Sequence, residues 1–160
     1  MNIYLFIIPF ILVFDYVLSF IVRTLNLKAL DPVLPSEFED TFDKDKYLKS
    51  QDYARVNSKF SYITSTFSLM FSLFFIFGGI YNLIDQYVIS FGYNSILTGL
   101  LFFAILTIIT DVLSLPFSLY STFIIEEKFG FNKTTLNVFF TDKLKGYFLM
   151  VLLGTPILAT

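Results

Sequence analysis

The amino-acid sequence predicts an all-α, polytopic transmembrane helical bundle, and three observations lead to this fold class. Of the 160 residues, 56% are hydrophobic and only 15% are charged. Soluble domains have about 45–50% apolar and about 25% charged residues. The apolar residues are concentrated in four long stretches, and all 11 Lys and Arg residues lie outside them. An ordinary soluble globular domain is therefore excluded.

The four apolar stretches predict the membrane spans. Residues 3–22, 60–84 and 96–125 each reach the roughly 20 residues that a helix needs to cross a bilayer. Residues 3–22 have no basic segment before them and no A-x-A-like cleavage site, so we expect a retained span, not a signal peptide. Residues 146–160 are shorter, and we interpret them as a truncated fourth span. The alternative is a natural C-terminal helix that lies in the membrane interface.

The positions of the basic residues predict the orientation. Seven of the 11 lie in residues 23–59 and four lie in residues 126–145. Cytoplasmic loops carry an excess of Lys and Arg. We therefore expect cytoplasmic loops at 23–59 and 126–145, with the N-terminus outside. The composition, rich in Phe and Lys, favours the inner membrane of a bacterium; in a eukaryote we expect the ER membrane.

The composition also excludes several kinds of functional site. The chain has no His and no Cys, so it offers no thiolate or imidazole ligand and no His general base. The net charge of −2 argues against nucleic acid as a partner. We expect no catalytic residue, no metal ligand and no bound cofactor in this chain. The lipid bilayer is one expected partner.

Polar residues recur along two of the predicted spans at helical spacing. In residues 96–125 the stripe consists of Thr107, Asp111, Ser114 and Ser118, followed by Ser121 and Thr122. A carboxylate in the middle of a span usually faces a protein interior or a water-filled cavity, so Asp111 is either a cavity residue or a hydrogen-bonded packing residue. Asp15 receives the same interpretation. A second stripe begins just before residues 60–84 and favours helix packing over a cavity wall. It consists of Ser58, Ser61, Ser65, Ser68 and Ser72.

Helix breakers predict local departures from straight helices. Pro116 removes a backbone donor and should kink its span. Gly78 and Gly79 should loosen or bend the preceding helix. No Gly or Pro occurs between Asp43 and Gly78, so we expect one long helix that enters the membrane from the cytoplasm.

Two segments resemble a known family. Residues 115–132, LPFSLYSTFIIEEKFGFN, and residues 47–55, YLKSQDYAR, resemble the N-terminal membrane region of the CaaX prenyl proteases, integral-membrane zinc endopeptidases of the a-factor-converting type. The resemblance covers most of the chain from about Leu34 onward, including the order and spacing of the spans between the motifs.

The resemblance implies a larger architecture and a function. It implies a seven-span helical barrel around a water-filled chamber, of which this chain is the N-terminal domain, with the zinc catalytic domain absent. It also implies zinc in the parent enzyme, held by an H-E-x-x-H helix and a further Glu that this chain lacks. The implied partners are the C-terminal catalytic half of the same protein and a peptide or protein substrate.

The resemblance also indicates candidate positions that line the chamber or dock the catalytic half. They are Asp111, Ser114, Ser118, Tyr120, Thr122, Glu126, Glu127 and Asn132. Phe129 occupies a position that is often His in the family, so a polar role there is in doubt.

Two function classes follow. The first is the N-terminal membrane domain of a zinc metalloendopeptidase that cleaves CaaX-type prenylated or membrane-associated polypeptides. The alternative is a non-catalytic helical membrane scaffold or binding protein without protease activity. A transporter or channel ranks last, because the sequence has no paired half-helices or repeats.

Overall fold

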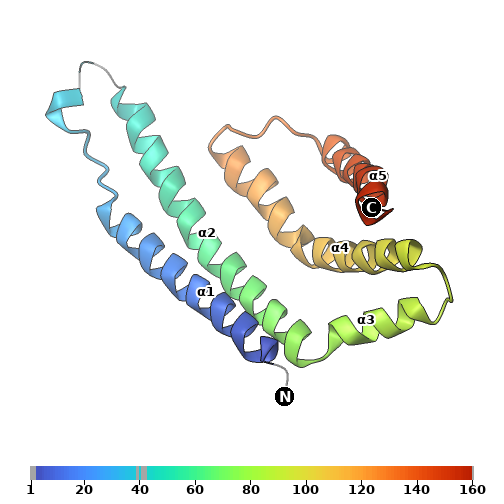
Figure 1. Cartoon of the computed structure of the whole chain (residues 1–160). Coiled ribbons are helices and arrows are strands. Elements are labelled where there is room, and N and C mark those ends of the chain that lie inside the picture. The colour runs from blue at the N-terminus through green and yellow to red at the C-terminus, as the bar shows by residue number, and fades with distance from the viewer. Residues whose placement is uncertain (1–2, 39, 41–42, 160) are drawn as a thin grey trace. The chain divides into compact units, whose positions relative to one another are not determined.

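The computed structural model describes residues 3–38, 40 and 43–159, and every regular element in these residues is helical (Figure 1). The chain divides into two compact units, Met1–Gly78 and Gly79–Thr160. Within the described residues, three helical segments are long and apolar enough to cross a membrane: Tyr4–Ala29, Lys44–Phe77 and Ser95–Glu126. The predicted fold class is thereby confirmed.

The first unit is a hairpin of two long helices, α1 (Tyr4–Ala29) and α2 (Lys44–Phe77), joined by a segment that contains the short helix η1 (Ser36–Phe38). Figure 1 shows α1 and α2 side by side. Tyr16 pairs with Thr66 and Thr24 with Tyr62, each through a hydrogen bond of 2.8 Å, so the two helices are antiparallel. The two α2 partners, Tyr62 and Thr66, are neighbours of the predicted serine stripe and do not belong to it.

α2 begins where the sequence predicts a long helix. Asp43 is its N-cap, and its carboxylate accepts hydrogen bonds from the backbone N–H groups of Asp45 (2.9 Å) and Lys46 (3.1 Å). Such a cap satisfies donors that have no partner within the helix. The prediction of one helix from Asp43 towards Gly78 is confirmed, and most of the predicted 23–59 loop is therefore helical.

The predicted second span, 60–84, is divided between the two units. α2 ends at Phe77, and Gly79 has a φ of +69°, a left-handed conformation that favours glycine. A separate short helix, α3 (Ile80–Ile89), follows. The hydrophobic run continues through this break, so hydropathy alone extended the span too far.

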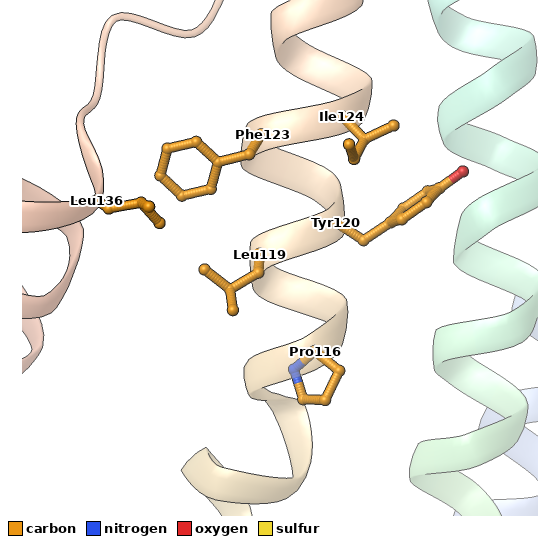
Figure 2. Close-up of a pocket in the computed structure, with 6 residues that line it drawn as sticks. All are labelled: Pro116, Leu119, Tyr120, Phe123, Ile124 and Leu136. Atoms are coloured by element: carbon orange, nitrogen blue, oxygen red, sulfur yellow. The ribbon is translucent and has the colours of Figure 1, made fainter.

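The second unit consists of α3, α4 (Ser95–Tyr120), a π-helical turn η2 (Ser121–Glu126) and α5 (Leu136–Ala159). α3 packs on α4 and buries Ile84 and Val88. The Asn94 side chain caps α4 by accepting a hydrogen bond from Leu97 N–H at 2.9 Å. The ribbon of α4 changes direction part way along (Figure 1), and Figure 2 shows Pro116 at such a bend, as the sequence predicts.

α5 begins at Leu136, well before the predicted fourth span at 146–160. Thr135 initiates the helix, because its backbone carbonyl accepts from Phe139 N–H (2.9 Å) and its hydroxyl accepts from Val138 N–H (3.3 Å). The predicted loop 126–145 therefore contains only a short connection, and its second half is helical. The expectation of a loop depended on four lysines, and the helix includes two of them, Lys143 and Lys145.

Candidate functional site

The α4–α5 interface contains the polar stripe predicted around Asp111. Along α5, the partly buried side chains recur at helical spacing, whereas most of the others are exposed. They are Phe139, Lys143, Tyr147, Met150 and Gly154. This spacing places them on one face of the helix, and that face meets α4.

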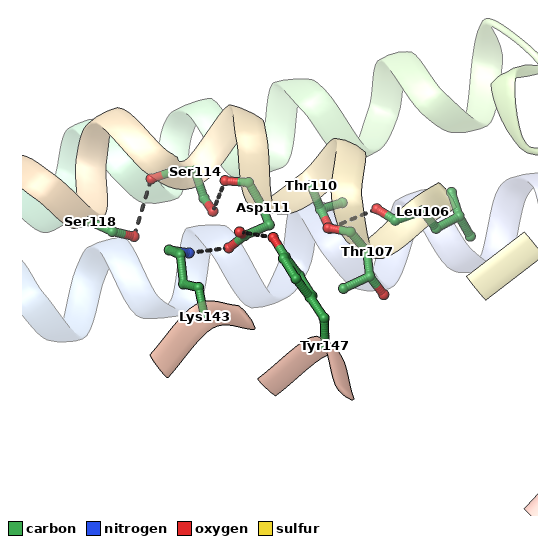
Figure 3. A network of polar contacts seen from close by, with 8 residues as sticks. All are labelled: Leu106, Thr107, Thr110, Asp111, Ser114, Ser118, Lys143 and Tyr147. Carbon is green, nitrogen blue, oxygen red and sulfur yellow. Dashed lines mark hydrogen bonds and ion pairs between the residues drawn. The ribbon is translucent and has the colours of Figure 1, made fainter. Parts of the chain in front are cut away.

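Asp111 is the centre of this interface. Its carboxylate accepts hydrogen bonds from the Lys143 ammonium and from the Tyr147 phenol, and Lys143 and Asp111 form an ion pair (Figure 3). The Lys143 and Asp111 side chains are only 23% and 24% exposed. We call Asp111, Lys143 and Tyr147 the Asp111 cluster. Asp111 was expected to be either a cavity residue or a hydrogen-bonded packing residue. Its contacts are those of a hydrogen-bonded residue, and it also lines a cleft.

The cleft lies beside the Asp111 cluster and has a volume of about 210 Å³. The rest of its lining is apolar and consists of Val112, Leu115, Phe140 and Leu144. The Lys143 ammonium also lies 5.4 Å from the centre of the Phe139 ring, within reach of a cation–π interaction. An ion pair with apolar surroundings can hold two helices in one register, and this pair is partly exposed beside the cleft.

Ser114 and Ser118 follow Asp111 along α4, but their hydroxyl groups are used within the helix. Ser114 donates to the Asp111 carbonyl at 3.1 Å, and Ser118 donates to the Ser114 carbonyl at 3.2 Å (Figure 3). Such bonds to the preceding turn satisfy a hydroxyl in an apolar environment.

Three other predicted positions meet in the turn that joins η2 to α5. The Asn132 side chain donates to the Glu127 carboxylate at 3.0 Å and accepts from Thr134 N–H at 2.7 Å. The Glu126 carbonyl accepts from Phe131 N–H at 2.9 Å and from Asn132 N–H at 3.3 Å. We call residues 126–134 the clasp turn. Glu126, Glu127 and Asn132 are therefore linked by hydrogen bonds, which the spacing alone did not show.

Tyr120 and Thr122 lie near the η2 turn, away from the Asp111 cluster in sequence. Tyr120 lines an open apolar groove of about 470 Å³ with Pro116, Leu119, Phe123, Ile124 and Leu136. Figure 2 shows Leu119 and Phe123 pointing towards Leu136 at the start of α5. Thr122 is partly buried in η2. Phe129, whose polar role was in doubt, is buried with 6% exposure, as suits an aromatic packing residue.

The other predicted intramembrane carboxylate, Asp15, has a different environment. It is exposed on α1 and has no hydrogen-bond or ion-pair partner among the described residues. The two intramembrane carboxylates therefore differ in their contacts. Of the two, Asp111 has a basic partner among the described residues and Asp15 has none.

The residues present do not fit a zinc site. The chain has no His and no Cys. Across residues 3–38, 40 and 43–159, no three or more Asp and Glu side chains come close enough to hold a metal ion. A structural or catalytic zinc needs three or four such ligands.

Sequence reasoning missed Lys143 and Tyr147. Lys143 was counted with a cytoplasmic loop, and Tyr147 was not singled out. A signal was present, because Lys143, Tyr147 and Met150 have the 4 and 3 spacing of one helix face. Met150 accepts a hydrogen bond from Thr107 at 3.4 Å, so this face of α5 matches the stripe on α4.

These features define an integral, multi-pass helical membrane protein with an ionic cluster between two of its helices. A family model described as "CAAX prenyl protease N-terminal, five membrane helices" matches residues 23–160. The chain belongs to this family.

Relatives and a solved structure agree with this assignment. CAAX prenyl protease 1 of Saccharomyces cerevisiae is 33% identical over 142 residues, which cover 82% of this chain and 31% of that protein. A probable CAAX prenyl protease 1 of Schizosaccharomyces pombe is 39% identical over 124 residues, or 69% of this chain and 26% of that protein. The crystal structure of S. mikatae Ste24p superposes with a TM-score of 0.88 at 28% identity, covering 99% of this chain and 39% of that chain. This chain therefore spans about a third of the length of the relatives it matches.

Proposed function

We propose that this chain forms the N-terminal membrane part of a zinc metalloendopeptidase that cleaves CaaX-type prenylated or membrane-associated polypeptides. Its helices would form part of the wall of an intramembrane chamber in a seven-span barrel. The observation that supports this proposal is the family match over residues 23–160. The names of the relatives and of the solved structure point the same way.

The proposal assigns the chemistry to another part of the same enzyme. Because no residue set described in this chain fits zinc, the metal and its general base would come from the C-terminal catalytic half. This chain would supply the membrane anchor, the surface that contacts the catalytic half, and part of the path along which the substrate reaches it.

The proposed orientation has the N-terminus outside and both basic segments in the cytoplasm. The positive-inside rule supports it. Lys143 should be left out of that argument, because it is paired with Asp111 in the interface between two helices. Of the remaining 10 basic residues, three lie outside the three candidate spans, and the other seven lie in the last turns of α1 or in the N-terminal half of α2.

The candidate residues divide into two proposed roles. Asp111, Ser114 and Ser118 would line the chamber wall, with Tyr120 and Thr122 further along the same helical segment. Glu126, Glu127 and Asn132 would present the clasp turn to the catalytic half. The partial exposure of Asp111 beside its cleft and the exposed Glu127 carboxylate support these roles.

The complete reading frame that contains this chain provides the test. The gene product would be purified in detergent and assayed on a farnesylated CaaX peptide, with a metal chelator and then with added zinc. We expect cleavage that the chelator abolishes and zinc restores. A reading frame that encodes no H-E-x-x-H helix, and a product without chelator-sensitive cleavage, would instead support the non-catalytic scaffold or binding protein.

A further inference from the structure

Asp15 is a carboxylate within α1, a helix that is apolar enough to cross a membrane. Arg23 lies eight residues further along α1, or about 12 Å at 1.5 Å per residue. On the other side of Asp15, the helix is uncharged from Tyr4 to Phe14. The Asp15 side chain is exposed and has no partner among the described residues. A charge at this depth is unfavourable in lipid and usually faces a protein interior or a water-filled cavity.

The contacts between α1 and α2 show which face of the hairpin carries Asp15. Tyr16 and Thr66 share a hydrogen bond of 2.8 Å, so each side chain points towards the other helix. Asp15 directly precedes Tyr16, and Ser65 directly precedes Thr66. One residue is a rotation of about 100° around a helix. Because the two helices are antiparallel, the same sense of rotation carries Asp15 and Ser65 to the same face of the hairpin.

This face carries further polar side chains at helical spacing, and we call it the Asp15 face. It consists of Asp15, Ser19 and Asn26 on α1 and of Ser58, Ser61, Ser65, Ser68 and Ser72 on α2. Of these eight side chains, Ser65 alone has hydrogen-bond partners among the described residues, the carbonyls of Ser61 (2.7 Å) and Tyr62 (3.2 Å). Elsewhere on α2, Thr64 and Thr66 donate to carbonyls of the preceding turn at 3.2 and 2.7 Å. Unused hydroxyl groups are thus a property of this face.

The opposite face of the hairpin is apolar. Val17 and Phe67 directly follow Tyr16 and Thr66, so they are rotated away from the Asp15 face. Both are exposed, as is Phe74 further along the same side of α2. Such a face suits lipid, so the two faces of one hairpin differ in the surroundings that they need.

Asp111 shows what a carboxylate requires when it lies between helices, namely the ammonium of Lys143 and the phenol of Tyr147. Asp15 has neither kind of donor. The nearest basic residue of α1 is Arg23, and its guanidinium lies 5.5 Å from the centre of the Tyr62 ring. Close helix packing, which the sequence favoured for the serine stripe, would leave the unused groups of this face without partners. Water supplies both donors and acceptors to all of them.

We propose that the Asp15 face lines a water-filled space within the membrane, with Asp15 as its charged residue. This inference deepens the proposed function and rests on it, because it names the part of the hairpin that would line the intramembrane chamber. It adds Asp15, which lies outside the residues that the family model matches. The opposite face, with Val17 and Phe67, would face lipid.

The absence of Cys from the chain allows water to be mapped with single thiols. The product of the complete reading frame, with every cysteine beyond these 160 residues replaced by serine, would be treated in membrane vesicles with N-ethylmaleimide. This reagent crosses membranes but reacts with ionised thiols. Asp15→Cys and Ser68→Cys place a thiol on the Asp15 face. Val17→Cys and Met70→Cys are the matched controls, because each lies two residues further along the same helix, about 3 Å in depth and about 200° around the axis.

We expect the two thiols of the Asp15 face to be labelled faster than their controls by about tenfold or more, because apolar surroundings suppress the ionisation of a thiol. After unfolding in SDS, all four variants should be labelled at the same rate. Cysteine differs little in shape from serine, so Ser68→Cys keeps the proposal open to test even if Asp15→Cys alters the fold.

Two results would overturn the proposal. One is labelling of Ser68→Cys, or of an Asp15→Cys variant with an unchanged unfolding temperature, as slow as that of its control, since lipid or another helix would then cover this face. The other is fast labelling of Val17→Cys or Met70→Cys, since water would then reach both faces. Loss of chelator-sensitive cleavage would contradict the protease function alone, so the two proposals can fail separately.

Discussion

The side-chain oxygens of Thr24 and Tyr62 lie 2.8 Å apart and share a hydrogen bond between α1 and α2. The same Tyr62 ring contacts Phe20 at 4.8 Å between centroids and lies 5.5 Å from the Arg23 guanidinium. One α2 side chain thus combines a polar, an aromatic and a cationic contact with α1. Because lipid provides no hydrophobic force between helices, such contacts carry the association.

The first prediction separates these contacts. Tyr62→Phe removes only the hydrogen bond and should lower the free energy of unfolding by about 0.6 kcal/mol, a typical value for one such bond in a membrane bundle. Tyr62→Ala also removes the ring and should destabilise the hairpin further. Thermal unfolding in detergent measures both.

Tyr87→Phe is the matched control for Tyr62→Phe. Its ring is 61% exposed on α3 and keeps its contact with Phe91, so we expect no change in the unfolding temperature. Equal effects of the two Tyr→Phe variants would contradict the role assigned to the Thr24–Tyr62 bond.

Local signals made much of this fold predictable. The apolar stretches predict three spans because a helix needs about 20 consecutive apolar residues to cross a bilayer. Such a stretch can be recognised directly in the sequence. Asp43 was placed correctly at the start of α2 because a long interval without Gly or Pro follows it. The bend of α4 could be predicted at Pro116 because proline has no backbone N–H to donate within a helix.

The features that sequence reasoning missed depend on contacts between distant residues. Asp111 stands out as a lone carboxylate in an apolar stretch, but its partner is 32 residues away, and only the α4–α5 register identifies it. Lys143 was assigned to a loop because the fourth span was predicted to begin only after the last charged residue. The predicted second span ran past the end of α2 to residue 84 because hydrophobicity continues beyond Gly79, although a loosening or bend at Gly78 and Gly79 was expected.

The second prediction tests whether the clasp turn has a role beyond its own structure. Glu127→Gln keeps an oxygen that can accept the Asn132 hydrogen bond but removes the negative charge. If Glu127 docks the catalytic half by its charge, the complete enzyme should lose activity while its unfolding temperature stays the same.

Asn132→Ala is the structural counterpart of this variant. It removes both the bond to Glu127 and the bond from Thr134 N–H, so it should destabilise the turn by about 1 kcal/mol and speed tryptic cleavage after Lys128 and Lys133. Full activity of Glu127→Gln would restrict Glu127 to a local role.

The third prediction compares two glycines that differ in backbone conformation. A Cβ at Gly79 or at Gly146 would meet nothing within 4 Å, so neither position is limited by space. Gly79 has a φ of +69°, whereas Gly146 lies within α5. Gly79→Ala should destabilise the chain by about 1–2 kcal/mol, because an L residue is strained there. Gly146→Ala should stabilise it by about 0.5–1 kcal/mol, because alanine favours a helix.

Chemical or thermal unfolding of the two alanine variants, measured under the same conditions, checks the signs. Opposite shifts are expected. If Gly79→Ala were neutral or stabilising, the break between α2 and α3 would not depend on a left-handed residue, and a continuous helix through residue 79 would be the better description.

The fourth prediction concerns the depth of α3. This helix has ten residues and is about 15 Å long, too short to cross a bilayer, and it connects two helices that are each long enough to do so. Its exposed side chains include Tyr81, Leu83 and Tyr87, and tyrosine is enriched where membrane and water meet. We therefore expect α3 to lie in the interface.

The chain contains no Trp, so a single Trp reports its own depth in vesicles of brominated lipid. Tyr87→Trp should be quenched most by bromine near the headgroups. Phe103→Trp is the control, because Phe103 is 52% exposed and lies about 12 Å along α4 from Ser95, so deeper bromine should quench it most. The same quenching profile at both positions, or no quenching of Tyr87→Trp, would place α3 away from the interface and make it a helix covered by protein or water.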